Sequence, residues 1–574
     1  MICLIRPPAI ECFRFATTSV TLPLGLAYIA GALEAAGHEV EVIDALGEAP
    51  EHHTRYFKGY MMGLSLDQIV ERIPRDVEAI GISVIFTHEW PMAVRLIDLI
   101  KRKFPVTPVI LGGEHITALP EFSLMTSQAD VLVLGEGEET IVELVDALRD
   151  GEDLATIEGI AFRRDGSIQM NRRRNRRTNI DDIPWPSWRH FKIETYTQQH
   201  HVGGVFTGDV SMPILATRGC PYQCTYCSSI NMWTPKWIPR DPIKVVDEIE
   251  HYVNTYGAGS FPFQDLTAII EKDWILRFCR ELQRRKLKVS WQLASGTRSE
   301  AIDAEVAEEL RNSGMIMMSY APESGSETTR KYIKKKMKTD RLLASLQSAA
   351  SAGLNIAIFL VIGFPHDRIE HFQENIPFID AVAAKGASDL SISFYMALPG
   401  TELFHSLYDA GKIKLDRKYF THILDSLSLL PSQTYSDIGR LQLAWWKLRL
   451  IFAFYGSRRR IREKTGFLGS VRRALSGLSS NASHDSKLQT AVRNGLVSGL
   501  NVMKVQMSPR WIPFAEEKAM FSRWDYIYRS IRQRNIAAGT ALVRPLDTSE
   551  LHKTNVIGLL DADHGSVRTI PALN

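Results

Sequence analysis

The stretch CPYQCTYC, residues 220–227, decides how the chain is interpreted. It places Cys220, Cys224 and Cys227 four and three residues apart, directly after the segment MPILATRG at 212–219. Residues 214–216 are apolar and a glycine follows, so we expect a buried strand that ends just before the cysteines. Folds of the α/β class gather their chemistry on loops at the carboxyl ends of strands. The three thiols are therefore candidates for a metal centre.

Three thiolates suit two kinds of metal site. A [4Fe–4S] cluster held by three cysteines keeps one iron without a protein ligand, open to a small molecule. A structural zinc ion needs a fourth ligand, for which His200 and His201 are the nearest upstream histidines. The spacing favours the cluster and leaves zinc open.

The motif CxxxCxxC, with Tyr226 ahead of its last cysteine, resembles the signature of radical S-adenosylmethionine (SAM) enzymes. The resemblance implies that Cys220, Cys224 and Cys227 hold a [4Fe–4S] cluster whose open iron binds SAM. In that family one electron then splits SAM to a 5′-deoxyadenosyl radical.

Composition bounds the class of protein. The 574 residues are 45% apolar and 23% charged, with a net charge of +3, so we expect several domains and no nucleic-acid partner. Cys3, Cys12 and Cys279 lie outside the motif and are expected as reduced thiols of a cytoplasmic protein. We expect no signal peptide, because Arg6 interrupts the short apolar start, and no apolar run reaches the roughly 18 residues of a transmembrane segment.

Residues 1–150 alternate between strand and helix patterns, which predicts a doubly wound, Rossmann-like parallel sheet. The expected strands are 2–5, 38–43, 79–85, 108–113 and 131–134, and the expected helices are 24–36, 90–103 and the segment ending near 148. Ligands of such sheets bind beyond the carboxyl ends of the strands, here at 83–87, 112–117 and 135–138.

These strand ends carry a second resemblance. The segments PP at 7–8, PLGL at 23–26, GGEH at 112–115 and GEGE at 135–138 resemble the cobalamin-binding domain fused ahead of many radical SAM enzymes. The motif DxHxxG of better-known cobalamin proteins is absent, so it stays open whether His115 ligates cobalt or only forms hydrogen bonds, and we favour the latter. The cobalamin contacts implied are Ser83, Thr87, Gly112, Gly113, His115, Gly135 and Glu136.

Residues 151–207 read as a connector. Its basic run RRRNRR at 172–177 could bind nucleic acid or form a solvated hairpin edge, and we favour the edge because the net charge supplies no wider basic field.

Strand and helix patterns resume over 208–425 and predict a partial (βα)6, TIM-like barrel, the fold that the radical SAM resemblance implies. The expected strands are 214–216, 259–265, 288–294, 315–320, 354–362 and 389–394. Strand-end side chains here have plain alternatives, such as helix capping or surface charge. The resemblance implies that contacts to SAM or substrate come from Tyr226, Asp265, Arg298, Glu323 and Ser324.

Residues 426–574 predict a mainly helical C-terminal region. Leu441, Ala444, Trp445, Leu448, Phe452 and Tyr455 share one helical face. We favour a helix that docks on its own domain through this face over one that lies on a membrane.

Taken together, the resemblances imply a cobalamin-dependent radical SAM enzyme, related to the anaerobic magnesium-protoporphyrin monomethyl ester cyclases. Its cofactors would be a [4Fe–4S] cluster, SAM and cobalamin, its substrate a small molecule, and its electron donor a flavodoxin or ferredoxin. Methyl transfer is the favoured reaction, with oxidative cyclisation or rearrangement as the alternative. A non-catalytic cobalamin protein with a structural zinc site is the distant alternative.

Overall fold

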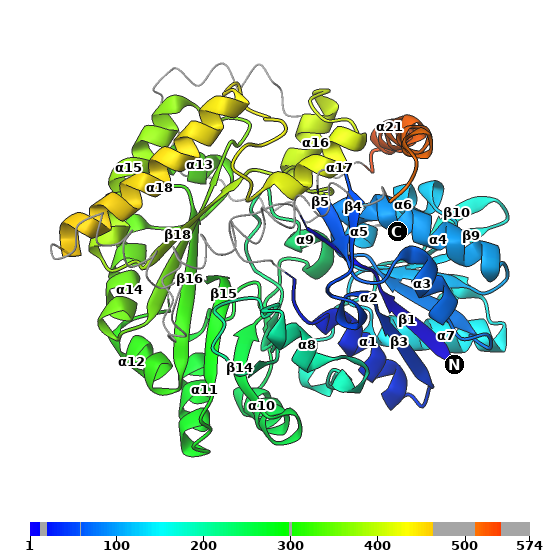
Figure 1. Ribbon diagram of the computed structural model, residues 1–574, viewed down its shortest axis with the longest axis horizontal. Helices are drawn as coiled ribbons and strands as arrows, with labels where there is room; N and C mark the ends of the chain where they lie inside the picture. Colours follow the sequence, from blue (N-terminus) through cyan, green and yellow to red (C-terminus); the bar gives the residue numbers. More distant parts are fainter. Residues whose placement is uncertain (12–19, 58, 298–300, 463–510, 541–574) are drawn as a thin grey trace.

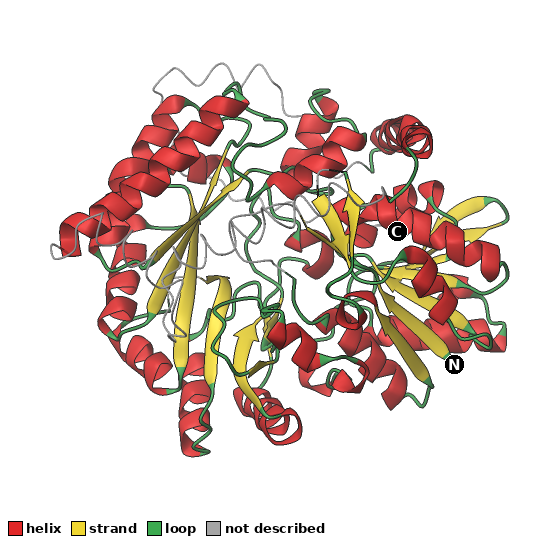
Figure 2. Ribbon diagram, in the orientation of Figure 1, coloured by secondary structure: helices red, strands yellow, loops and turns green. Residues whose placement is uncertain are grey.

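The computed structural model describes residues 1–11, 20–57, 59–297, 301–462 and 511–540. Two sheets lie side by side, each covered by helices, and C-terminal helices pack across the top of the view (Figures 1 and 2). The first sheet is built from residues 2–170 and the second from residues 210–394, which include the cysteine motif.

The first sheet has seven strands in the order β10-β9-β8-β7-β6-β1-β3. Five are parallel: β1 (Ile2–Arg6), β3 (Val40–Asp44), β6 (Ala79–Ser83), β7 (Val109–Gly112) and β8 (Val131–Val133). Ile2 and Leu4 of β1 belong to the core that α1 (Leu24–Ala35) and α7 (Glu138–Asp150) cover. Cys3 and Ile5 belong to the core under α3 (Leu66–Arg72) and α4 (Trp90–Lys103). Helices on both faces confirm the predicted doubly wound sheet.

Two further strands come from the predicted connector. The strands β9 (Ile160–Arg164) and β10 (Ser167–Met170) extend the first sheet beyond β8 in antiparallel fashion. A separate small sheet joins β2 (Ala9–Glu11), β4 (His53–Tyr56) and β5 (Gly59–Met62). The remaining short helices of this half are α2 (Ala45–Glu48), α5 (Glu114–Ala118), α6 (Pro120–Thr126) and α8 (Ile193–Gln198).

The second sheet has six parallel strands in strict chain order. They are β11 (Val210–Ser211), β14 (Ala258–Phe263), β15 (Ser290–Thr297), β16 (Met315–Glu323), β17 (Asn355–Ile362) and β18 (Asp389–Phe394). Sequential order of parallel strands with helical crossovers is the topology of a partial (βα)6 barrel, as predicted. The crossover helices are α10 (Pro242–Tyr256), α11 (Lys272–Arg284), α12 (Ala304–Asn312), α13 (Glu327–Tyr332), α14 (Thr339–Ser351) and α15 (Ile369–Ala384).

The strand expected at 214–216 is wrong. Ile214 forms only an isolated bridge to Phe263, and β11 takes the edge of the sheet instead. The reason is local: the backbone N–H groups of Ala216 and Thr217 donate to the carboxylate of Asp265, so they do not enter the ladder of the second sheet.

The C-terminal helix α18 (Arg440–Arg462) packs against α15 and β18. Leu443, Trp446, Leu450 and Phe454 form its buried face. The helix therefore docks on its own domain, as predicted, but the predicted face is wrong, because Leu441 is 76% and Phe452 70% exposed. The helix is apolar on both faces, and periodicity alone could not decide between them.

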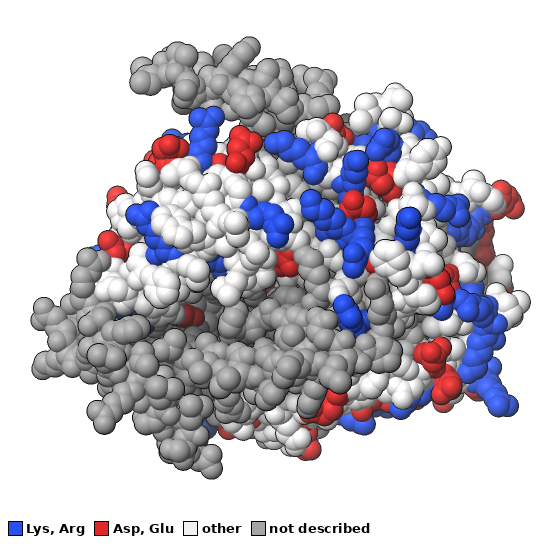
Figure 3. Space-filling model, turned by 45° about the horizontal axis from the view of Figure 1, so that its top comes forward, with Lys and Arg blue, Asp and Glu red and all other residues white. Residues whose placement is uncertain are grey.

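The helix α21 (Phe514–Ala537) packs on α6 of the first half. It also contacts α16 (Glu402–Asp409) and α17 (Arg417–His422), where Arg532 pairs with Asp409 at 2.7 Å. None of the helices in the described part of the chain is long and apolar enough to cross a membrane. Basic and acidic side chains are interspersed on the face shown in Figure 3.

Candidate functional site

The cysteine loop, residues 219–237, projects from the second sheet and returns to its starting point. Its two ends meet in an antiparallel ribbon of β12 (Thr217–Arg218) and β13 (Ile238–Pro239). Gly219 begins the loop with a φ of +87°, a conformation that L side chains rarely adopt. A Cβ there would also collide with the carbonyl oxygen of Lys236. The local sequence TRGC therefore needs its glycine.

The three motif thiols differ from the other described cysteines. Cys220, Cys224 and Cys227 are partly exposed, whereas Cys3 and Cys279 are buried, and Cys12 lies outside the described residues. Burial is the main cause that raises the pKa of Cys224 to about 11, so metal binding there must release a proton.

The loop geometry suits a cluster better than a single ion. Three sulfurs on one zinc ion lie about 3.8 Å apart, because zinc–sulfur bonds are about 2.3 Å long. Within the described residues, the side chains whose ligand atoms all lie within 4.8 Å of one another are His366, Asp367 and His371, so the three sulfurs are spread more widely. The donor set of three thiols fits a [4Fe–4S] cluster, and the sulfurs are too widely spread to bind one zinc ion together without moving.

Hydrogen bonds hold the loop in place. The N–H of Thr225 donates to the carbonyl of Ile333 at 3.1 Å, and its own carbonyl accepts from Leu403 N–H at 3.1 Å. The thiol of Cys227 donates to the hydroxyl of Ser229 at 3.2 Å. The backbone around the cysteines is thus fixed from two sides.

Glu323 lies beside the cysteines, as its predicted role requires. It ends β16 with a φ of +65°, which is a strained conformation for a glutamate. Strained backbone conformations of this kind often occur at functional sites. Its carboxylate pairs with Lys335 at 3.0 Å, and both charges act on Cys224. Burial, reinforced by Glu323, raises the pKa of Tyr226. Sequence reasoning missed Lys335, because it lies in a lysine run that looks like an ordinary solvated surface.

The other predicted SAM contacts are placed differently. Asp265 is 3% exposed and accepts from Ala216 N–H at 3.2 Å, Thr217 N–H at 2.5 Å and Thr217 Oγ1 at 2.6 Å. It thereby anchors the chain that leads into the cysteine loop. Ser324 is buried, and its hydroxyl accepts from Ser326 N–H at 3.1 Å. Arg298 lies outside the described residues. Contact of these groups with SAM stays a prediction.

The strand ends of the first sheet are open at Gly112. Ser83 and Gly112 are partners at the ends of β6 and β7, and a Cβ on Gly112 would meet nothing within 4 Å. The neighbouring Gly113 has a φ of +126°, and a Cβ there would collide with the carbonyl of Val84. This edge therefore leaves room for a ligand at one glycine and needs the other for its turn, which fits the predicted cobalamin site.

His115 is 1% exposed, and burial lowers its pKa to about 3. Its Nδ1 lies 3.2 Å from Oγ1 of Thr87, and its ring packs on Trp90. The favoured interpretation of His115 as a hydrogen-bonding residue agrees with this placement. Its ligation of cobalt stays a prediction.

The third strand end joins the two halves of the molecule. Glu136 accepts from Arg176 at 2.9 Å and from Arg218 at 3.1 Å, and Arg218 also reaches Glu138 at 2.6 Å. Arg218 precedes the cysteine motif, so this network ties the first sheet to the cysteine loop. Gly135, next to Glu136, has a φ of +78°. Contacts of Gly135 and Glu136 with cobalamin stay predictions.

The basic run at 172–177 is part of the same junction. Arg176 is 7% exposed and also donates to the carbonyls of Trp233 and Lys236, at 2.7 and 2.6 Å. Arg173 donates to the carbonyls of Asn231 and Met232. The expectation of a solvated edge is therefore wrong for Arg173 and Arg176, whose guanidinium groups satisfy carbonyls of the segment that follows the cysteines, whereas Arg172 is 65% exposed. The sequence could not reveal partners that lie about sixty residues away.

The two candidate edges meet directly. The helix α9 (Ser229–Trp233), which follows Cys227, packs on α5, which follows Gly113 (Figure 1). Thr117 of α5 contacts Met232 of α9, with its hydroxyl 3.8 Å from the sulfur. Glu114 forms a side-chain hydrogen bond with Ser228, the residue after Cys227. The segment that follows Gly113 and the segment that follows Cys227 are thus in direct contact.

Comparison with known proteins gives two family matches. Residues 14–145 match the B12 binding domain and residues 214–379 match the radical SAM superfamily, within the halves predicted as 1–150 and 208–425. The chain is 29% identical over 447 residues to cytidylyl-2-hydroxyethylphosphonate methyltransferase of Streptomyces wedmorensis, covering 71% of this chain and 82% of that protein.

Two further similarities concern a curated relative and a solved structure. The chain is 27% identical over 405 residues to anaerobic magnesium-protoporphyrin IX monomethyl ester cyclase of Rubrivivax gelatinosus, covering 69% of this chain and 68% of the cyclase. Its fold is similar to that of the radical SAM methyltransferase TsrM of Kitasatospora setae, solved with cobalamin and a [4Fe–4S] cluster bound. The TM-score is 0.59 at 15% identity, over 87% of this chain and 99% of that one.

Proposed function

We propose that this chain, a radical SAM enzyme with a B12-binding domain, transfers a methyl group to an unactivated carbon of a small-molecule substrate. The observation that carries the proposal is the contact of α5 with α9, which joins the strand ends of the first sheet to the cysteine loop. A substrate held at this junction would be within reach of both cofactor sites. The similarity to a methyltransferase over most of both chains supports methyl transfer.

When bound, the cluster supplies the electron that cleaves SAM, and cobalamin supplies the methyl group. Cys220, Cys224 and Cys227 would hold the cluster. Glu323 and Lys335 would bind polar groups of SAM through charge-assisted hydrogen bonds, which are short and directional. Asp265 acts as a positioning residue, because its carboxylate holds the backbone that leads into the cysteine loop.

The test is an anaerobic assay on the full chain with a reconstituted cluster, cobalamin, dithionite and SAM. We expect 5′-deoxyadenosine from the native chain and none from Cys224→Ala. The matched control is Cys279→Ala, which removes a buried thiol outside the loop and should retain deoxyadenosine formation. Undiminished deoxyadenosine in Cys224→Ala would contradict the assignment of the cluster, and full turnover without cobalamin would contradict methyl transfer.

Oxidative cyclisation is the second candidate reaction, because the chain is also similar to a protoporphyrin ester cyclase over about two thirds of its length. Product mass separates the two reactions. A gain of one CH₂ group indicates methylation, whereas a loss of hydrogen or a gain of oxygen indicates oxidation.

A flavodoxin or a ferredoxin is the electron donor that we propose, since a low-potential one-electron carrier suits an iron–sulfur cluster. Replacing dithionite by a reduced flavodoxin should sustain deoxyadenosine formation. Activity with dithionite but with neither protein donor would contradict this part of the proposal.

A further inference from the structure

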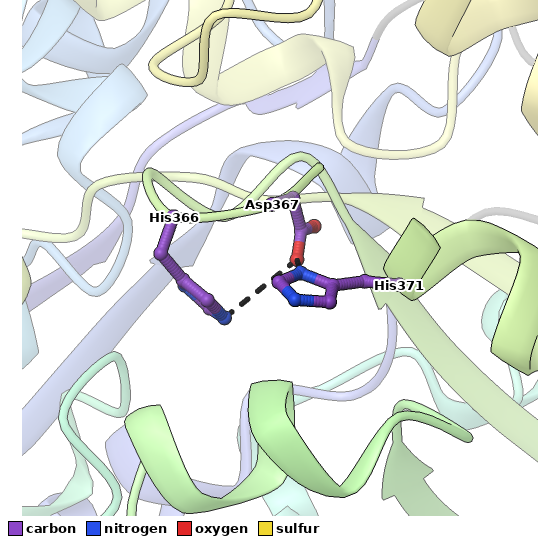
Figure 4. Close-up of side chains that lie close together, drawn as sticks. All are labelled: His366, Asp367 and His371. Carbon is purple, nitrogen blue, oxygen red and sulfur yellow. Dashed lines mark ion pairs between the residues drawn. The ribbon is translucent and has the colours of Figure 1, made fainter. Parts of the chain in front are cut away.

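Two histidines and a carboxylate converge where β17 ends. His366 and Asp367 lie on the loop after β17, and His371 lies in the first turns of α15 (Figure 4). One ligand atom from each side chain lies within 4.8 Å of the others. In Figure 4 both imidazole rings face the same carboxylate oxygen of Asp367, which the dashed lines mark.

The loop holds the carboxylate of Asp367 in a fixed orientation. Oδ2 accepts from the N–H groups of Gly363 at 2.8 Å and Phe364 at 3.0 Å. Oδ1 accepts from Oγ1 of Thr329 at 3.2 Å and faces the two rings. It lies 3.8 Å from Nε2 of His366 and 3.8 Å from Nδ1 of His371, too far for a hydrogen bond to either. One oxygen is thus used by the backbone, and the other points between the histidines.

His366 presents an unsatisfied imidazole to this carboxylate. Its side chain is 9% exposed, and neither ring nitrogen has a hydrogen-bond partner. Its ring packs on Tyr332 at a centroid distance of 3.7 Å. A neutral imidazole nitrogen is a common metal ligand. A buried imidazole without partners is costly, and a cation between the rings would satisfy it.

The charge balance points the same way. Asp367 is 4% exposed, and no lysine or arginine nitrogen of the described chain is recorded within 4.0 Å of its carboxylate. Hydrogen bonds replace part of the hydration that this carboxylate loses on burial, but no cation neutralises its charge. His371 Nδ1 accepts only a long hydrogen bond, 3.3 Å from the N–H of Arg368, which a metal would displace at small cost.

We propose that His366, Asp367 and His371 bind a divalent first-row transition-metal ion, such as Zn²⁺. Nitrogen and oxygen ligands lie about 2.0–2.2 Å from zinc, which puts neighbouring ligands about 3.4 Å apart in a tetrahedral site. The two gaps of 3.8 Å close to that value with side-chain shifts of a few tenths of an ångström. Two imidazoles and one carboxylate leave a position open for water or another ligand.

The position of the site gives the ion a structural role. Phe364, held by Asp367, packs on Tyr226 at a centroid distance of 5.5 Å, and Tyr226 precedes Cys227. An ion that fixes the loop 363–368 to α15 would therefore stabilise the cysteine loop through the contact of Phe364 with Tyr226. The site lies outside that loop, and its occupancy does not depend on the proposed reaction.

The test measures bound zinc and its ligands directly. Full-length protein with its cluster reconstituted, so that the motif cysteines are occupied, is equilibrated with Zn²⁺ and desalted. We expect about one zinc per chain, with nitrogen and oxygen neighbours at about 2.0–2.1 Å in X-ray absorption spectra. His366→Gln and His371→Gln should each weaken zinc binding at least tenfold, and zinc should raise the Tm of the native chain but not of these variants.

His405→Gln is the matched control. His405 is also buried with both ring nitrogens unpartnered, but it does not belong to the cluster. Its substitution should leave zinc binding unchanged, which separates loss of a ligand from loss of a buried histidine. No retained zinc, sulfur neighbours at about 2.3 Å, or unchanged affinity in both His366→Gln and His371→Gln would overturn the proposal.

Discussion

The strand ends of the two sheets are built in opposite ways. The first sheet ends in small residues, and at Gly112 it leaves empty space. The second sheet brings thiols, a strained glutamate and a lysine together, with the backbone around them held by hydrogen bonds. The first edge is suited to admit a large ligand by leaving room, and the second to bind one by supplying ligands. The two edges should therefore fail in different ways when they are altered.

The largest effect is expected at the entry to the cysteine loop. Gly219→Ala adds a Cβ that collides with the carbonyl of Lys236 at a φ of +87°, so the loop cannot keep its path. We expect nearly complete loss of cluster iron, measured as iron per chain after reconstitution. Gly208→Ala is the control, because Gly208 has a φ of +93° but nothing within 4 Å of the added Cβ. Equal iron loss in both variants would mean that strain, rather than the collision, disrupts the loop.

The junction between the two edges should be next in sensitivity. Arg218 is 4% exposed and pairs with Glu136 and Glu138, so Arg218→Met leaves the poorly hydrated Glu138 without its cation and leaves Glu136 with Arg176 alone. Breaking a buried pair in this way costs about 3–5 kcal/mol. Urea unfolding measures the loss. Arg284→Met, which removes a 70% exposed partner of Glu281, should cost at most about 1 kcal/mol. Similar costs for the two variants would show that the junction contributes little.

At the strand ends of the first sheet, two adjacent glycines are expected to have different roles, one in stability and one in cobalamin binding. Gly113→Ala places a Cβ against the carbonyl of Val84 at a φ of +126° and should destabilise the chain by about 3 kcal/mol. Gly112→Leu adds a larger side chain where a Cβ meets nothing, so the free energy of unfolding should change by less than about 1 kcal/mol. It should nevertheless lower cobalamin affinity at least tenfold, measured by equilibrium dialysis. Unaltered cobalamin binding in Gly112→Leu would place the ligand away from this edge.

The sequence predicted elements well where one pattern had one explanation. The helix at 90–103 and the strand at 389–394 match α4 and β18 to the residue. Prediction failed where a partner distant in the sequence decided the structure. The strand at 214–216 is replaced because Asp265 takes its N–H groups, and the stripe on α18 faces outward because the opposite face is equally apolar.

The two edges differ in the same respect. The cysteines and Glu323 could be found from the sequence, because ligands are particular residue types at particular spacings. The open space at Gly112 could not, since a glycine that leaves room and a glycine that makes a turn look alike in a sequence.

The smallest effect is expected at Asp265, where it tells whether this carboxylate positions the cysteine loop or binds SAM. Burial raises the pKa of Asp265 from its ordinary value near 4 to about 6. The folded state therefore holds a proton that the unfolded chain has lost between these values. Stability due to this group falls as pH rises from about 4 to about 6, by about 3 kcal/mol in total. Asp265→Asn loses one acceptor for the N–H groups of Ala216 and Thr217, at a cost of about 1–3 kcal/mol, but it carries no titrating charge.

Asp265→Asn should therefore be less stable than the native chain at pH 4.5, and the difference should shrink or vanish by pH 7.5. Urea unfolding at the two pH values measures this change. Deoxyadenosine formation should persist in the variant at a reduced rate. Loss of a positioning residue shifts the cysteine loop but removes no contact with SAM. A stability difference independent of pH would show that the carboxyl stays ionised in the fold. A rise in KM for SAM at unchanged kcat would instead place Asp265 in contact with SAM. The carboxylate of Asp265 would then bind SAM directly as well as anchor the backbone ahead of the cysteine loop.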